Sequence, residues 1–182
     1  MKKVIIYLAD GFEEIEALGT ADILRRGGAE VKIVSIKNDK NLIGSNNIKI
    51  IADETIDDIN ENDYDMIVFP GGMENAKSLA DSEKVINIIK KFNEQGKLIA
   101  SICASPAFAI NKSGIAKKRK ITCYPGLEDR LKDSNYVEEN AVTDGNLTTS
   151  RGPATTFEFA YKLLDELGLD SQSVKKGMLY TK

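Results

Sequence analysis

Histidine is absent from this sequence. It is the commonest general base in proteins and the commonest zinc ligand, so both roles fall to other side chains. A Ser-His-Asp triad or a Cys-His pair is excluded within one chain. The two cysteines and the scattered carboxylates lack the spacing of a transition-metal site, and no G-x-x-x-x-G-K phosphate-binding motif occurs. We therefore predict no metal and no cofactor.

Long apolar runs and excess positive charge are also missing. No stretch approaches the roughly 20 apolar residues of a membrane span. The short apolar run Val4–Leu8 is followed at once by Asp10, Glu13 and Glu14, which is typical of a strand and not of a signal peptide. A net charge of -3 lacks the basic footprint of a nucleic-acid-binding protein. We expect a cytoplasmic protein without membrane or nucleic-acid partners.

What is present suits a single globular domain. A chain of 182 residues, of which 42% are hydrophobic, can bury a core without a disulfide or a metal. No linker, repeat or low-complexity stretch divides the chain. We predict one domain over residues 1–182.

Apolar runs alternate with helical patterns along the chain. The runs predict strands at Val4–Leu8, Val31–Ile36, Met66–Phe69 and Leu98–Ile102, with residues 148–150 ending a further strand. The helical patterns cover residues 13–26, 82–95 and 153–167, and a short one covers 173–179. The expected buried faces are Ile15, Leu18, Ala21 and Leu24 in the first helix and Phe157, Ala160, Leu164 and Leu167 in the third. Residues 42–51 are expected to form a small hairpin or an excursion from the sheet.

This alternation implies an α/β fold with right-handed crossovers and a mostly parallel sheet. In the flavodoxin-like strand order 2-1-3-4, ligands bind beyond the carboxyl ends of strands 1 and 3. The loops that meet there are 9–16, 70–73 and 103–106. Together they supply a thiol, several carboxylates and a pair of glycines.

Cys103 lies on one of these loops, between a strand and a run of helical character. A residue at such a turn resembles a nucleophile elbow, and the start of the helix favours the reactive thiolate. The sequence pattern is equally consistent with a small buried cysteine that packs beneath the turn. Cys123 has no comparable placement, and we interpret it as structural.

The other two loops offer donors and acids. Gly71 and Gly72 can present backbone N–H groups to an oxyanion, although a tight turn alone also explains two glycines. Glu13, Glu14 and Glu16 fall in the first turn of a helix, where acids are favoured by the helix dipole. The pattern alone does not say which of the three carboxylates faces Cys103.

Four segments together resemble the motifs of the ThiJ/PfpI (DJ-one) superfamily, most closely its DJ-one branch. They are A-D-G-F-E-E-I-E at 9–16, F-P-G-G at 69–72, A-S-I-C-A-S-P at 100–106 and T-S-R-G-P at 149–153. Their order is the family's order, and they span nearly the whole chain. The resemblance implies a flavodoxin-like three-layer sandwich, similar to class I glutamine amidotransferases, and a homodimer.

The resemblance also implies roles for individual residues. Cys103 matches the family's reactive cysteine, and Glu16 matches the protonated carboxyl group bonded to its sulfur. Gly72 and Ala104 match the N–H donors, with Gly71 beside them. Ser150 and Arg151 match a segment that lines the pocket.

Two positions depart from the family pattern. Tyr124 stands where many members have a histidine near the cysteine, and Ala104 stands where the amidase and protease branch has one. Tyrosine is a poor base near neutral pH, because its ordinary pKa is about 10. Amide or peptide hydrolysis is therefore the least favoured activity.

The resemblance leaves two main functions open. One is a slow, cofactor-free glyoxalase or deglycase that acts on methylglyoxal or glycated adducts, with Cys103 as nucleophile and Glu16 as proton carrier. The other is a redox-sensing or protective, chaperone-like protein whose Cys103 is oxidised to a sulfinic acid. The expected partner is accordingly a small reactive aldehyde or an oxidant.

Overall fold

The computed structural model describes residues 1–181 as alternating strands and helices. The strands are β1 (Lys3–Leu8), β2 (Glu30–Ser35), β3 (Asn41–Ile43), β4 (Lys49–Ile51), β5 (Glu54–Thr55), β6 (Met66–Phe69), β7 (Leu98–Ile102), β8 (Lys120–Ile121), β9 (Asn135–Tyr136), β10 (Ala141–Asp144) and β11 (Leu147–Ser150). The α-helices are α1 (Thr20–Arg26), α2 (Met73–Asp81), α3 (Glu83–Glu94), α4 (Asn111–Ser113), α5 (Thr156–Glu166) and α6 (Ser171–Gly177). Two π-helical turns, η1 (Ile15–Gly19) and η3 (Pro106–Ile110), precede α1 and α4. Short 3₁₀ turns cover Glu61–Asp63, Glu128–Leu131 and Pro153–Thr155.

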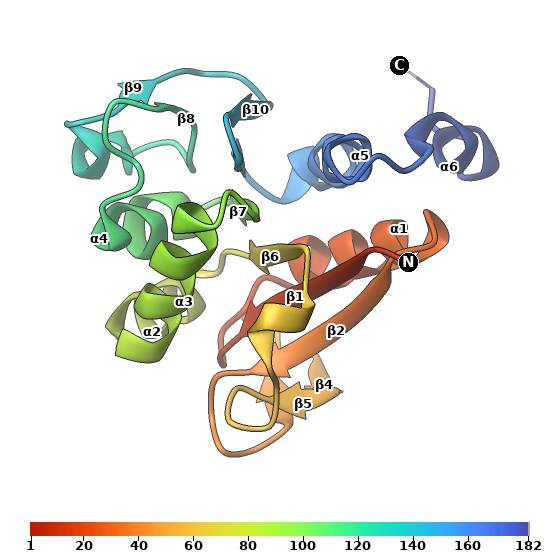
Figure 1. Ribbon diagram of the computed structural model, residues 1–182, viewed down its shortest axis with the longest axis horizontal. Helices are drawn as coiled ribbons and strands as arrows, with labels where there is room; N and C mark the ends of the chain where they lie inside the picture. The colour runs from red at the N-terminus through yellow and green to blue at the C-terminus, as the bar shows by residue number, and fades with distance from the viewer. Residues whose placement is uncertain (182) are drawn as a thin grey trace.

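A seven-stranded sheet organises the fold in the order β10-β11-β7-β6-β1-β2-β5. Its central strands run parallel, and only β10 pairs antiparallel, with β11. The run β2-β1-β6-β7 confirms the predicted order 2-1-3-4. Helices α1, α5 and α6 lie on one side of the sheet and α2, α3 and α4 on the other (Figure 1). The arrangement is the flavodoxin-like three-layer α/β sandwich that the sequence predicts.

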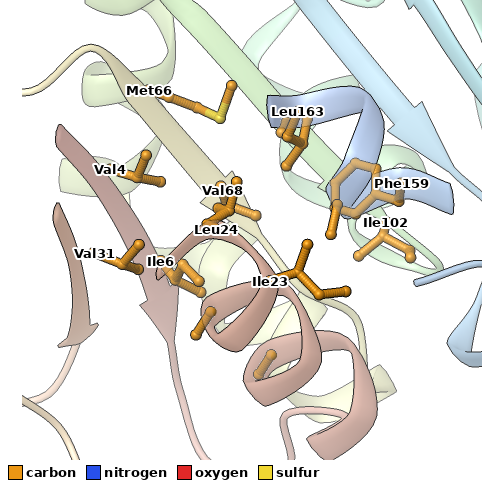
Figure 2. Packing of buried hydrophobic residues seen from close by; sticks show 14 of the residues in the cluster. Val4, Ile6, Ile23, Leu24, Val31, Met66, Val68, Ile102, Phe159 and Leu163 are labelled. Atoms are coloured by element: carbon orange, nitrogen blue, oxygen red, sulfur yellow. The ribbon is translucent and has the colours of Figure 1, made fainter. Parts of the chain in front are cut away.

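Each face of the sheet carries its own hydrophobic cluster. Alternate residues of the parallel strands point to opposite faces, so Ile6 and Val68 join one cluster, while Ile5 and Ile67 join the other. Figure 2 shows the first cluster, in which strand residues meet side chains from α1 and α5, among them Phe159. Full burial of one such side chain contributes about 1.5–3 kcal/mol. The two clusters hold the strand ends, and hence the loops between them, in fixed positions.

The predicted helix over 13–26 is wrong in two respects. Its first part is the π-helical turn η1, and Ile15 is 54% exposed instead of buried. The four apolar residues recur every three positions, whereas an α-helix has 3.6 residues per turn, so such a series drifts around the helix. Leu24 reaches the core, but Ile15 at the other end of the series does not.

The third helix differs similarly from the prediction. Phe157 was expected on its buried face but is 41% exposed, and Phe159 occupies the core in its place. The predicted cap of the second helix is confirmed, because the Ser82 hydroxyl accepts a hydrogen bond from the Val85 N–H (3.3 Å). The last helix begins at Ser171, two residues before the expected start, with Asp170 accepting from the Ser173 N–H.

Several elements have no counterpart in the sequence prediction. Helix α2 and the short strands β5, β8, β9 and β10 were not expected. The hairpin is confirmed, since β3 and β4 pair antiparallel. Within residues 1–181, no helix has the length and apolar character needed to cross a membrane. The same residues hold no group of three or more histidine, cysteine, aspartate or glutamate side chains placed to bind a metal ion.

Candidate functional site

Cys103 sits directly after the central strand β7 in a left-handed backbone conformation (φ 66°). A side chain other than glycine is uncommon in this region, and the conformation costs about 1–3 kcal/mol. Two backbone hydrogen bonds hold it: the Cys103 N–H donates to Ser150 O (3.0 Å), and its C=O accepts from the Tyr124 N–H (2.8 Å). Cys103 as a whole is 8% exposed. This geometry matches a nucleophile elbow.

Glu16 reaches the same place from the π-helical turn η1. Its side chain is fully buried, and its Oε2 accepts a hydrogen bond from the Gly71 N–H (2.7 Å). A methyl group added at Gly71 would lie 2.5 Å from Cys103 Cβ, 2.7 Å from Glu16 Oε2 and 2.9 Å from the sulfur. Only glycine therefore fits at residue 71, and the thiol and the carboxyl group meet across it.

Gly72 completes the turn after β6. Its φ is 87°, and an added Cβ would lie 2.1 Å from Gly11 O, so close packing and backbone conformation both require glycine. The N–H groups of Gly72 and Ala104 face the Cys103 sulfur and lower the pKa of the thiol. The pair of donors expected at the thiol is thus in position for a negative sulfur or oxygen.

Burial governs the charges of the thiol and its acid. It raises the pKa of Glu16 to about 8, although the bonds from Gly71 and Cys103 partly oppose the shift. Burial, followed by the charge of Glu16, raises the pKa of the Cys103 thiol. Two adjacent buried groups resist ionising together, so near neutral pH Glu16 keeps its proton and the pair carries one negative charge at most.

The neighbouring acids have different surroundings. Glu13 Oε2 accepts from the Glu16 N–H (2.8 Å) and so fixes the start of η1. Burial raises the pKa of Glu13. Glu14 points away, into the loop between β3 and β4, where it accepts from Asn46 N (2.7 Å), Asn46 Nδ2 (3.0 Å) and Ser45 Oγ (3.1 Å). The helical pattern left these three acids open and the resemblance selected Glu16; in the structure Glu16 is the one at the thiol.

The remaining predicted residues lie around the elbow in different ways. The Ser150 hydroxyl donates to Asn140 O (2.6 Å) and forms a second hydrogen bond with the Thr155 hydroxyl (2.7 Å). Tyr124 is 47% exposed, and its ring lies beside Gly152. The charge of Arg151 acts on Cys123 and Tyr136, where it lowers both pKa values against the effect of burial.

Cys123 is fully buried, as expected of a structural cysteine, and burial raises its pKa to about 12. It belongs to the hydrophobic cluster on one face of the sheet, whereas Cys103 belongs to the cluster on the other. Both cysteines are free thiols. The two thiols therefore have separate surroundings.

Two buried residues at the site escaped the sequence prediction. Asn75, on α2, bonds Ala9, Pro70 and Gly71, and Ser105 bonds Pro70. Ser105 stands in the elbow motif beside Cys103, and this proximity is a signal that sequence reasoning can use. Asn75 carries no such signal, because α2 itself was not predicted.

The parallel sheet is covered by helices on both faces. At the end of one strand it carries a cysteine in a strained conformation, beside a buried carboxyl group and two N–H donors. These features define an α/β protein with a cysteine at a nucleophile elbow. Residues 2–166 match the DJ-1/PfpI family, and the chain belongs to that family. The motifs at 9–16, 69–72, 100–106 and 149–153 indicated the same family.

Individual relatives agree with this assignment. The chain is 38% identical over 164 residues to the Arabidopsis thaliana protein DJ-1 homolog B, covering 90% of this chain and 37% of that one. It is 32% identical to a Pyrococcus horikoshii protein named as a deglycase, covering 85% and 93%. The crystal structure of Drosophila melanogaster DJ-1beta superposes with a TM-score of 0.95 at 34% identity, covering 100% and 99%. The chain thus spans less than half the length of the Arabidopsis relative.

Proposed function

We propose that this protein is a cysteine-dependent, cofactor-free glyoxalase or deglycase that acts on methylglyoxal or glycated adducts. The proposal rests on one observation: Cys103, Glu16 and the N–H groups of Gly72 and Ala104 lie together at the end of β7. The relative named as a deglycase supports the same class of reaction. The expected partner is a small reactive aldehyde.

The chemistry needs one nucleophile and one proton carrier. The reacting form is the Cys103 thiolate beside a protonated Glu16, which together carry one negative charge. The sulfur attacks the aldehyde carbon of methylglyoxal, a C–S bond forms as the C=O double bond opens, and the oxygen takes the Glu16 proton to give a hemithioacetal. The Glu16 carboxylate then removes the proton from that carbon and returns it to the neighbouring carbon, while the hydroxyl proton passes to the neighbouring oxygen, which converts the adduct to a thioester. Water hydrolyses the thioester to lactate and frees the thiol. The Gly72 and Ala104 N–H groups bind the oxyanion in each step.

The surroundings of the pair make this a slow enzyme. No histidine assists proton transfer, and burial raises the pKa of the thiol, so little thiolate is present at neutral pH. Hydrolysis of peptides or amides is disfavoured for the same reason, because an amine leaving group needs a stronger acid–base partner than this site holds.

The two cysteines provide a matched test. We expect lactate formation from methylglyoxal, measured at micromolar enzyme, to be lost in Cys103→Ser and kept in Cys123→Ser. Equal lactate formation by Cys103→Ser and wild type would refute the proposal. Absence of lactate in wild type, with Cys103 still the faster thiol to be alkylated, would favour the second candidate.

Redox sensing or protection through Cys103 is the second candidate, and the same donors support it. Each equivalent of peroxide transfers one oxygen to the sulfur and leaves as water, giving first a sulfenic and then a sulfinic acid. A protonated Glu16 and the two N–H groups are suited to bind sulfinate oxygens. Mass analysis after mild peroxide treatment tests it: oxygen added to Cys123 and none to Cys103 would exclude this role.

We also propose that the chain forms a single domain, that two copies form a homodimer, and that the protein is cytoplasmic. Ile15, Ile48 and Phe157 are 54%, 49% and 41% exposed. They lie on segments that pack together, since Glu14 accepts from the Ile48 N–H (3.4 Å) and Gly19 abuts Thr156. Exposed apolar side chains beside a site suit a subunit interface. Sedimentation should show a dimer for wild type and a monomer for Phe157→Asp, and a monomeric wild type would contradict this proposal.

A further inference from the structure

The turn Pro70-Gly71-Gly72 presents two successive peptide groups to the site. The Pro70–Gly71 peptide directs the Gly71 N–H to Glu16 Oε2 (2.7 Å), and the Gly71–Gly72 peptide directs the Gly72 N–H to Cys103. In a trans peptide the C=O points opposite to the N–H. Whatever holds the two carbonyls therefore also aims the two N–H groups.

One side chain holds both carbonyls. Asn75 is fully buried, and its Nδ2 donates to Pro70 O (2.8 Å) and to Gly71 O (3.0 Å). Its Oδ1 accepts from the Ala9 N–H (2.7 Å), where the loop towards Glu16 begins. One amide thus joins the loop after β1 to the turn after β6 and uses both of its hydrogens on that turn.

The loop that carries Cys103 is bonded to the Pro70 carbonyl as well. The hydroxyl of Ser105, two residues after Cys103 and fully buried, donates to Pro70 O (2.5 Å). Gly71 O accepts a further bond from the Glu13 N–H (3.1 Å). Gly71 and Gly72 have no side chains that could restrain the turn, so these bonds help to fix the direction of its peptide groups.

We propose that Asn75 is a positioning residue that directs the Gly71 N–H to Glu16 and the Gly72 N–H to Cys103. Ser105 contributes more weakly to the same positioning through its hydrogen bond to Pro70 O. The proposal builds on the function proposed above and adds two residues outside the reacting set. The site's N–H donors are backbone groups, and such donors act well only when they are fixed before the reaction.

Two readouts separate this proposal from the proposed function. The first is kcat for methylglyoxal, which Asn75→Ala should lower about 10- to 100-fold with a smaller change in KM, because loss of one oxyanion donor costs about 100-fold or more. The second is the pH dependence of Cys103 alkylation by iodoacetamide, which requires no turnover. Its midpoint should move to higher pH in Asn75→Ala, since the Gly72 N–H no longer faces the sulfur.

Three further variants complete the test. Asn75→Asp keeps the size and the acceptor for Ala9 but lacks both N–H donors, so it should resemble Asn75→Ala. Ser105→Ala should show a smaller change of the same kind, because Pro70 O retains the Asn75 bond. Val85→Ala, which removes part of a fully buried side chain from α3, serves as a control for lost stability and should leave the alkylation midpoint unchanged.

The outcomes are distinct. If wild type forms no lactate but Asn75→Ala and Asn75→Asp still shift the alkylation midpoint, the proposed function fails and the positioning role stands. If both folded Asn75 variants alkylate and turn over like wild type, the positioning role is overturned. A midpoint shift in the Asn75 variants no larger than that in Val85→Ala would likewise overturn it. If the Asn75 variants do not fold, Ser105→Ala takes their place: a midpoint shift supports the positioning role, and an unchanged midpoint overturns it.

Discussion

Glu14 and Glu16 are two residues apart and both buried, at 4% and 0% exposure, yet their pKa values shift in opposite directions. Burial alone would raise both values. At Glu14 the bonds from Asn46 and Ser45 outweigh it, and the pKa falls below its ordinary value. At Glu16 only the Gly71 N–H and the thiol oppose it, and the pKa rises to about 8.

The difference has two physical causes: the carboxyl group of Glu16 lies deeper in the protein than that of Glu14, and Glu14 accepts more hydrogen bonds. Several donors stabilise the Glu14 carboxylate, which thereby anchors the hairpin turn to the start of η1. Glu16 Oε1 has no hydrogen-bond partner among the described residues, and this oxygen is free to carry a proton. An acid with few donors is suited to proton transfer, and an acid with many is suited to structure.

Exchanging each carboxyl group for an amide tests this division most strongly. Glu16→Gln should lower lactate formation by about 100- to 10,000-fold, because the amide carries no transferable proton. Glu14→Gln should keep turnover within a few-fold of wild type. Kinetics on methylglyoxal, with Cys103 alkylation as a check that the thiol persists, measure both effects, and equal losses in the two variants would remove the distinction.

Stability, unlike turnover, should be lowered more by Glu14→Gln than by Glu16→Gln. Glu14→Gln replaces a carboxylate that accepts several bonds with a neutral amide, at a cost of about 2–4 kcal/mol in the free energy of unfolding at pH 7. The lowered pKa of Glu14 stabilises the fold only above the ordinary pKa of the group. The cost should therefore shrink as the pH falls below about 4.5, which urea unfolding at pH 4 and pH 7 measures; a cost independent of pH would contradict the assignment.

Each carboxyl group also packs against one glycine, and these glycines extend the comparison. An added Cβ at Gly71 lies 2.7 Å from Glu16 Oε2, and one at Gly44 lies 2.3 Å from Glu14 Oε1. Gly71→Ala should lower turnover about tenfold or more by displacing the thiol and its acid. Gly44→Ala should lower the melting temperature at nearly unchanged activity. Melting curves and kinetics of both variants measure these effects. A larger loss of turnover in Gly44→Ala than in Gly71→Ala would contradict the prediction.

A further prediction is a pH dependence of folding. The folded chain holds the Glu16 proton up to about pH 8, whereas the unfolded chain releases it near the ordinary value of 4.5. Between these values the folded state binds more protons, so the Glu16 contribution to stability is lost as pH rises. Glu16→Gln should gain on wild type by about 1.4 kcal/mol per pH unit in this window. Urea unfolding from pH 5 to pH 8 checks the slope, and parallel curves would contradict it.

The sequence predicted the framework of this site better than its details. The order β2-β1-β6-β7 follows from apolar strand runs and right-handed crossovers, and it brings the loops of Glu16 and Cys103 together. The helical pattern did not separate Glu14 from Glu16, which only the family motif distinguished, because the physical difference depends in part on donors from the hairpin, some 30 residues further along the chain. The exposure of Ile15 follows from a π-helical turn that a period of 3.6 does not describe. Asn75 was missed because its role lies in three tertiary hydrogen bonds.

A pH titration of the glutamate side-chain carboxyl carbons by ¹³C NMR tests the central claim most directly, with Glu14→Gln and Glu16→Gln assigning the two signals. We predict that the Glu16 signal titrates with a midpoint near pH 8 and that the Glu14 signal titrates below its ordinary value. A Glu16 midpoint at or below 4.5, its ordinary value, would contradict the account. In that case the residue beside Cys103 would be a carboxylate at neutral pH, and it would have no proton to give to a bound aldehyde or sulfinate.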